Sequence, residues 1–79
     1  MFYVYLIKVK LTNKLYFGST NDLRRRIMEH TKTKGKIELI YYEAYKVEKD
    51  ARLREYNLKY FGKAYGQLKR RISESLRAS

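Results

Sequence analysis

The residues best suited to chemistry gather between Tyr16 and His30, in the stretch YFGSTNDLRRRIMEH. An aromatic segment ends there at Gly18, side chains that can cap a helix follow at once, and three consecutive arginines come next. A guanidinium is a planar fork of N–H donors that matches the oxygens of a phosphate. The stretch therefore indicates that a phosphate group could be held near the start of a helix.

Hydrolysis of a phosphodiester needs a positioned water, a group that takes its proton, and positive charge near the phosphate and the leaving oxygen. A divalent cation can supply much of that charge and can activate the water. The chain has no cysteine and one histidine, which excludes thiolate and multi-histidine metal centres. Any metal must therefore be a hard cation held by carboxylate and water oxygens, such as Mg²⁺ or Mn²⁺.

The elements that must position these groups begin with a hairpin. Residues 2–9 are rich in β-forming side chains and apolar on both faces, which is typical of a strand covered on each side. Thr12 and Asn13 predict a tight turn, after which residues 15–17 would return antiparallel.

With a two-residue turn, Tyr16 would lie opposite Val9, and directly opposed residues share a face of the sheet. Alternation along the first strand then places Tyr5 and Tyr16 on the same side. A register shift of one residue would separate them.

A helix is expected to follow the hairpin, capped by one of residues 20–22 and ended by Gly35. Arg26 falls at the edge of its apolar stripe, whereas Arg24 and Arg25 point away from it. The stripe itself consists of Leu23, Ile27 and His30.

The rest of the chain predicts a third strand over 37–44, a helix over 48–61 that stops at Gly62, and a third amphipathic helix over 64–77. The order ββαβαα predicts an α/β domain over residues 1–79, with a small antiparallel three-stranded sheet flanked by helices. The inward stripe of the helix over 48–61 would comprise Val47, Ala51, Leu58 and Phe61.

Glu55 falls on that inward side, and a carboxylate at the edge of a core is costly to bury without a positive neighbour. It could be a structural partner of Arg26, Arg52 or another cation. Glu43, near the end of the third strand, is a weaker rival to Glu55 as a functional carboxylate.

Nineteen lysines and arginines against eight acidic residues give a net charge of +11, so polyanions are the expected partners. Nine tyrosines favour nucleic acid over an anionic membrane, because their rings can stack on bases. No segment approaches the roughly 20 apolar residues of a membrane span, and no signal peptide is evident, so a cytoplasmic location is expected. The side chains expected to contact the nucleic-acid backbone are Arg24, Arg25, Lys69, Arg70 and Arg71.

The whole pattern resembles the GIY-YIG nuclease superfamily, in which two tyrosine motifs on adjacent strands precede a helix with a catalytic arginine. The resemblance runs from about Tyr3 to Lys59 and is greatest to short members that consist of the catalytic domain alone. The corresponding residues are Tyr3-Val4-Tyr5 for the first motif, Tyr16-Phe17-Gly18 for the second, Arg26 and His30 for the Arg-x-x-x-His of the helix, and Glu55 for the metal-binding glutamate.

The resemblance implies an endonuclease that hydrolyses DNA in a single step with one divalent cation, Mg²⁺ or Mn²⁺, held by Glu55. Tyr16 would act as general base or position the water, and Tyr5 would orient Tyr16 or that water. Arg26 would hold the scissile phosphate, and His30 would contact the phosphate or steady the arginine.

Other interpretations stay open at this point. The charge alone would suit a catalytically inactive nucleic-acid-binding module of the same fold, and RNA is not excluded as a partner. The lack of a separate DNA-targeting domain in this sequence suggests a targeting protein or a homo-oligomer. Taken singly, Tyr5 and Tyr16 could be ordinary sheet aromatics and His30 an ordinary core histidine.

Overall fold

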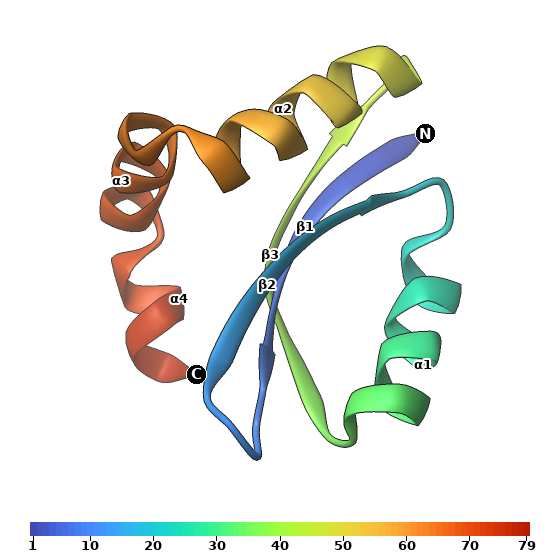
Figure 1. Cartoon of the computed structure of the whole chain (residues 1–79), viewed down its shortest axis with the longest axis vertical. Coiled ribbons are helices and arrows are strands. Elements are labelled where there is room, and N and C mark those ends of the chain that lie inside the picture. Colours follow the sequence, from blue (N-terminus) through green and yellow to red (C-terminus); the bar gives the residue numbers. More distant parts are fainter.

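The computed structural model describes residues 1–79, and three antiparallel strands in the spatial order β2-β1-β3 run through its centre (Figure 1). The predicted α/β class and the order ββαβαα are confirmed, with one further short helix at the end. The elements are β1 (Phe2–Val9), β2 (Lys14–Thr20), α1 (Leu23–Lys34), β3 (Ile37–Tyr45), α2 (Glu48–Tyr60), α3 (Gly62–Arg71) and α4 (Ser73–Ala78).

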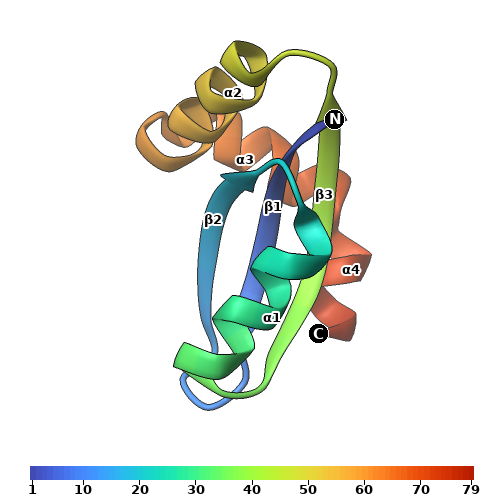
Figure 2. The same ribbon diagram turned by 90° about the vertical axis from the view of Figure 1, so that its right-hand side faces the viewer.

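β1 is the central strand and is buried on both faces, as its apolar pattern predicts. α1 covers one face, while α2, α3 and α4 lie on the other (Figures 1 and 2). Val4 points to the second face and joins Ala51, Leu58 and Leu68 in the core cluster. Tyr5 points to the α1 face and is only 2% exposed. Each face of the sheet therefore packs against its own layer of helices.

The predicted two-residue turn of the hairpin is wrong, because four residues connect β1 to β2. Val9 pairs with Lys14, and Tyr16 lies opposite Ile7. The amide of Asn13 donates to the carbonyl of Val9 at 2.7 Å, and Asn13 has a φ of 59°, a left-handed conformation that asparagine tolerates. The register differs from the prediction by two residues, so Tyr16 keeps its predicted face.

The C-terminal helix predicted over 64–77 is in fact two helices, α3 and α4. They are separated at Ile72, which leaves helical geometry (φ −113°, ψ 27°) while it packs against the core cluster. Gly62 does not stop α2 but begins α3, because the extended backbone of Phe61 (φ −118°, ψ 105°) ends the preceding helix. The chain thus bends twice to follow the second face of the sheet.

The inward side of α2 is confirmed for Ala51 and Leu58, which are buried, and wrong for Val47 and Phe61. Val47 and Phe61 are 50% and 52% exposed because both are extended cap residues, beyond the turns that face the sheet. Glu55 lies on the inward side and is half-buried.

Glu43, on β3, links this strand to α2 through hydrogen bonds and an ion pair. Its carboxylate accepts hydrogen bonds from Tyr41 Oη at 2.6 Å, from Tyr45 Oη and from Arg54 Nε at 2.8 Å. Burial raises the pKa of Glu43, but the Arg54 guanidinium and the two phenols outweigh burial, so the pKa lies below its ordinary value. Burial and the adjacent carboxylate raise the pKa of Tyr45 to about 12. With its oxygens satisfied in this way, Glu43 has a structural role.

Replacing Glu43 with glutamine should therefore destabilise the fold. Arg54 would keep its half-buried charge without a carboxylate, and we expect the free energy of unfolding to fall by about 2 kcal/mol. Urea unfolding followed by circular dichroism measures this. Glu74→Gln is the matched control, because it breaks the exposed pair with Arg77 and should cost less than about 0.5 kcal/mol. Equal effects of the two substitutions would contradict the structural role of Glu43.

Candidate active site

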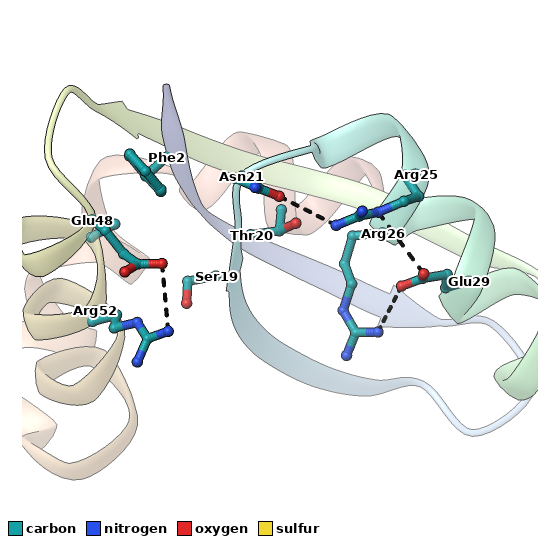
Figure 3. A pocket seen from close by; sticks show the side chains of 10 residues that line it. Phe2, Ser19, Thr20, Asn21, Arg25, Arg26, Glu29, Glu48 and Arg52 are labelled. Atoms are coloured by element: carbon teal, nitrogen blue, oxygen red, sulfur yellow. Dashed lines mark hydrogen bonds and ion pairs between the residues drawn. The ribbon is translucent and has the colours of Figure 1, made fainter.

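Two hollows meet at Ser19, near the end of β2. The first, here called the arginine hollow, has a volume of about 420 Å³ and lies between α1 and α2; it is lined by Arg25, Arg26 and Arg52 among others. The second, here called the glutamate hollow, has a volume of about 310 Å³ and runs along α2 past Glu55. Ser19 and Arg52 line both hollows. Figure 3 shows Ser19 between the side chains of the two helices.

α1 begins as predicted, because the Asp22 side chain accepts the amide hydrogen of Arg25 at 3.1 Å. Thr20 Oγ1 in turn accepts the amide hydrogen of Asp22 at 3.1 Å. These bonds satisfy free donors at the helix start. They fix the direction in which α1 leaves β2 and, with it, the direction in which Arg26 projects.

Arg26 lies at the edge of the apolar stripe of α1 and projects into the arginine hollow (Figure 3). Its Nη1 pairs with Glu29 Oε1 at 3.0 Å, and Arg52 Nη2 pairs with Glu48 Oε2 at 3.5 Å. Each ion pair joins neighbouring turns within its own helix and is well exposed, so each contributes little to stability. A phosphate entering the hollow can therefore take over these guanidinium donors.

Tyr5 and His30 are in direct contact between β1 and α1. Tyr5 Oη and His30 Nε2 are 2.7 Å apart, and both side chains are buried. Burial, followed by the positive charges of Arg26 and Lys34, lowers the pKa of His30. The imidazole is therefore neutral near pH 7, and its Nε2 can accept the phenol hydrogen. The Glu29 carboxylate and then the Tyr5 phenol raise the pKa of Arg26, so its guanidinium stays charged.

His30 should make folding stability depend on pH. Because its pKa in the folded state lies below the model-peptide value of about 6.5, the unfolded chain binds the proton more readily. We expect the melting temperature to fall as the pH drops from 7.5 through 6.5 to 5. His30→Gln, which keeps a hydrogen-bond acceptor for Tyr5, should flatten this part of the profile. The same slope in both proteins, measured by thermal melting, would assign the dependence to another group.

Gly18 makes room for Tyr5, its partner across the hairpin. A Cβ atom on Gly18 would lie 2.2 Å from Tyr5 Oη and 2.4 Å from Cζ. The phenol ring therefore lies over the backbone of β2, where no side chain larger than hydrogen fits. This contact explains the glycine in the Tyr16-Phe17-Gly18 motif.

Glu55 lies on the other face of the sheet. Ser19 Oγ donates to its Oε1 at 2.6 Å, and Lys59 Nζ pairs with its Oε2 at 2.7 Å. Burial raises the pKa of Glu55, but the hydrogen bonds from Lys59 and Ser19 outweigh burial, so the pKa lies below its ordinary value. The carboxylate is therefore ionised at neutral pH. Lys59 is thus the cation beside Glu55, rather than Arg26. The two hollows that meet at Ser19 connect Glu55 with the Arg26 side around the edge strand β2.

Tyr16 lies on the α1 face of β2 and is 39% exposed. Lys34 Nζ lies over its ring, 5.1 Å from the centroid. Tyr16 lines neither the arginine hollow nor the glutamate hollow, but shares a third, apolar hollow with Lys59. The structure therefore places Tyr16 nearer the start of β2 than Ser19, beside two lysines.

A metal cage is not present, since no three His, Cys, Asp or Glu side chains are grouped to hold an ion. Glu55 is a single carboxylate on a polar hollow, bordered by the hydroxyl of Ser19. This donor set fits a Mg²⁺-like ion, which keeps several waters and needs one or two carboxylates plus phosphate oxygens. Lys59 would have to release Oε2 to such an ion.

Of the remaining predicted residues, Arg25 lines the arginine hollow and the other four lie outside both hollows. Arg24 is exposed on the outer side of α1, and Arg25 bonds Asn21 Oδ1 at 3.2 Å. Three basic residues in the last turn of α3 are exposed far from α1, with Lys69 Nζ over the Tyr65 ring at 5.3 Å. They are Lys69, Arg70 and Arg71.

Sequence reasoning missed four residues of the site: Ser19, Glu29, Lys34 and Lys59. The i, i+4 spacing of Glu55 and Lys59 was a usable signal, because such pairs meet on a helix surface. Glu29 is three residues from Arg26 and gave a similar signal. Ser19 gave none, since only the packing of α2 against β2 brings its hydroxyl to Glu55.

Comparison with known proteins places this geometry in context. Residues 1–65 match the model of the GIY-YIG catalytic domain. The UPF0213 protein CPE1444 of Clostridium perfringens is 37% identical over 67 residues, covering 75% of this chain and 71% of the relative. The UPF0213 protein SH2523 of Staphylococcus haemolyticus is 36% identical over 69 residues, covering 77% and 83%. No solved structure gives a significant match. None of the helices has both the length and the apolar character needed to cross a membrane.

Proposed function

This chain belongs to the GIY-YIG catalytic-domain family, and on that premise we propose that it is a divalent-metal-dependent endonuclease that hydrolyses DNA. The observation that carries the proposal is the meeting of the arginine and glutamate hollows at Ser19. One hollow offers guanidinium donors for a phosphate, and the other offers an ionised carboxylate. The net charge of +11 supports a polyanionic substrate.

Glu55 would hold the cation, Mg²⁺ or Mn²⁺, which when bound supplies positive charge to the phosphate and acidifies its own water. The low pKa of Glu55 keeps the carboxylate available for a ligand at neutral pH. Ser19 holds one carboxylate oxygen in place. When Lys59 gives up the other oxygen, its ammonium becomes free to contact the substrate backbone.

Arg26 would bind the scissile phosphate through its planar fork. Glu29 holds the guanidinium in the hollow until the substrate arrives, and the phosphate then replaces this weak partner. Arg52 enters the same hollow from α2 and can bind a neighbouring phosphate oxygen. Arginines from α1 and α2 would thus contact the DNA backbone from opposite sides of β2.

Tyr5 and His30 would act as a pair on the α1 side. The neutral imidazole accepts the phenol hydrogen and leaves the Tyr5 oxygen a lone pair for Arg26 or a water. Tyr16 would position the attacking water or take its proton. Its exposed ring beside Lys34 supports access to a substrate that runs along β2.

The second candidate is a nucleic-acid-binding module without catalysis, which the charge of +11 alone favours. The decisive experiment incubates the purified chain with single-stranded, double-stranded and branched DNA, and with RNA as a comparison, in Mg²⁺, Mn²⁺ or EDTA. We expect metal-dependent cleavage of at least one DNA form and no product in EDTA. Tight, salt-sensitive binding without product under all of these conditions would favour the binding module.

A further inference from the structure

Three aromatic rings are exposed together at the C-terminal end of α2. Tyr56, Tyr60 and Phe61, here called the aromatic platform, are 53%, 68% and 52% exposed. The ring centroids of Tyr56 and Tyr60 are 4.9 Å apart at 49°, and those of Tyr56 and Phe61 are 5.9 Å apart at 65°. These rings pack on one another and not into the core cluster. Together they form a preformed surface on which another planar ring can stack.

The aromatic platform borders the glutamate hollow. Tyr56 and Tyr60 line it together with Glu55 and with two cationic side chains, Arg52 and Lys59. A ring that stacks a base and a cation that holds the adjoining phosphate are the two parts of a single-strand binding surface. The platform therefore lies where the nucleotide beside a bound phosphate would place its base.

We propose that Tyr56 and Tyr60 stack an unpaired nucleobase next to the scissile phosphate. The proposal rests on the proposed function, which assigns the cation to the glutamate hollow and the scissile phosphate to the arginine hollow that meets it at Ser19. In a duplex both faces of each base are covered by neighbouring bases, so only an unpaired or extruded base can lie on the platform. The substrate is accordingly a single strand, or DNA with unpaired nucleotides at the cleavage position.

Charge favours a nucleic acid over a second copy of this chain as the occupant. Two chains would each bring a net charge of +11 to the contact, and Arg52 and Lys59 lie beside the rings. Like charges at close range oppose such a pairing, whereas a phosphodiester strand neutralises them.

The test measures affinity in EDTA, where no cleavage occurs, for a single-stranded oligonucleotide and for a duplex of the same sequence. Tyr60→Ala should weaken single-strand binding about 10-fold, in line with the loss of one base–aromatic stack. It should change duplex binding less than about twofold, because the ring has no base to contact there. Tyr60→Phe keeps the ring and should bind the single strand like the wild type.

Tyr42→Ala is the matched control. Tyr42 is 51% exposed and has a single ring partner, Tyr3 at 6.0 Å, but it lines neither hollow. Loss of this ring should leave the affinities for the single strand and for the duplex unchanged. Equal weakening by Tyr42→Ala, equal loss on both DNA forms, or no loss with Tyr60→Ala would overturn the proposal. A change in oligomeric state with unchanged DNA affinity would assign the platform to a second copy.

The binding test of the base site and the cleavage test of the proposed function can fail independently. If Tyr60→Ala selectively weakens single-strand binding but no DNA form is ever cleaved, the base site stands and the enzymatic proposal fails. If DNA is cleaved in Mg²⁺ but Tyr60→Ala has no effect on single-strand affinity, the enzymatic proposal stands and the base site fails.

Discussion

Replacing Glu55 with glutamine should abolish DNA cleavage, lowering the single-turnover rate by about 10³-fold or more. Glutamine can still accept the hydrogen bond of Ser19, so the local fold is preserved. It carries no charge to hold a divalent cation. Affinity for DNA should stay the same or rise, because the substitution removes a negative charge and frees Lys59.

The measurement is single-turnover cleavage at saturating protein, with binding measured separately in EDTA. Glu43→Gln is the control, since Glu43 is also a hydrogen-bonded carboxylate but pairs with Arg54 and lines neither hollow. It should cleave at the wild-type rate despite its lower stability. Equal rates for wild type and Glu55→Gln would remove Glu55 from the reaction.

Replacing Gly18 with alanine should damage both stability and activity. The added Cβ would lie 2.2 Å from Tyr5 Oη, and Tyr5 is buried against His30, so the ring has no free space into which to move. Overpacking of this kind costs about 1–3 kcal/mol, and we expect a value near 3. Cleavage should fall by about 10-fold or more, because the displaced phenol can no longer keep its place beside Arg26 and His30.

Chemical unfolding and cleavage assays on Gly18→Ala give both effects. Gly66→Ala is the matched control, because a Cβ there meets no atom within 4 Å and the residue lies within α3. That substitution should stabilise the protein by about 0.5–1 kcal/mol. In the Gly18→Ala background, Tyr5→Leu should recover stability but not cleavage. A Gly18→Ala protein as stable and active as Gly66→Ala would show that the contact with Tyr5 is unimportant.

The sequence predicted the elements that local physics determines. The β-forming residues 2–9, apolar on both faces, predicted a strand covered on each side, and Asp22 was among the residues expected to cap α1. The stripe of α1 predicted a buried His30 with Arg26 at its edge. In each case neighbouring residues decide the outcome.

Other features depend on contacts between distant segments. The four-residue loop is set by the pairing of β1 with β2, and the break at Ile72 goes with the packing of that residue against the core cluster. The same applies to the site. The resemblance implied that Tyr5, Tyr16, Arg26 and Glu55 act together on one phosphate. In the structure the sheet separates Tyr5 and His30 from Glu55, and the route between them passes around Ser19.

The most direct test of the site is a crystal structure with Mn²⁺ and a short phosphorothioate oligonucleotide that resists cleavage. We predict an anomalous Mn²⁺ peak at the Glu55 carboxylate, with Lys59 displaced and the Arg26 fork on the phosphate that contacts the ion. A metal peak at another carboxylate, or a Glu55 still paired with Lys59 and Ser19 in the metal-loaded complex, would contradict the account.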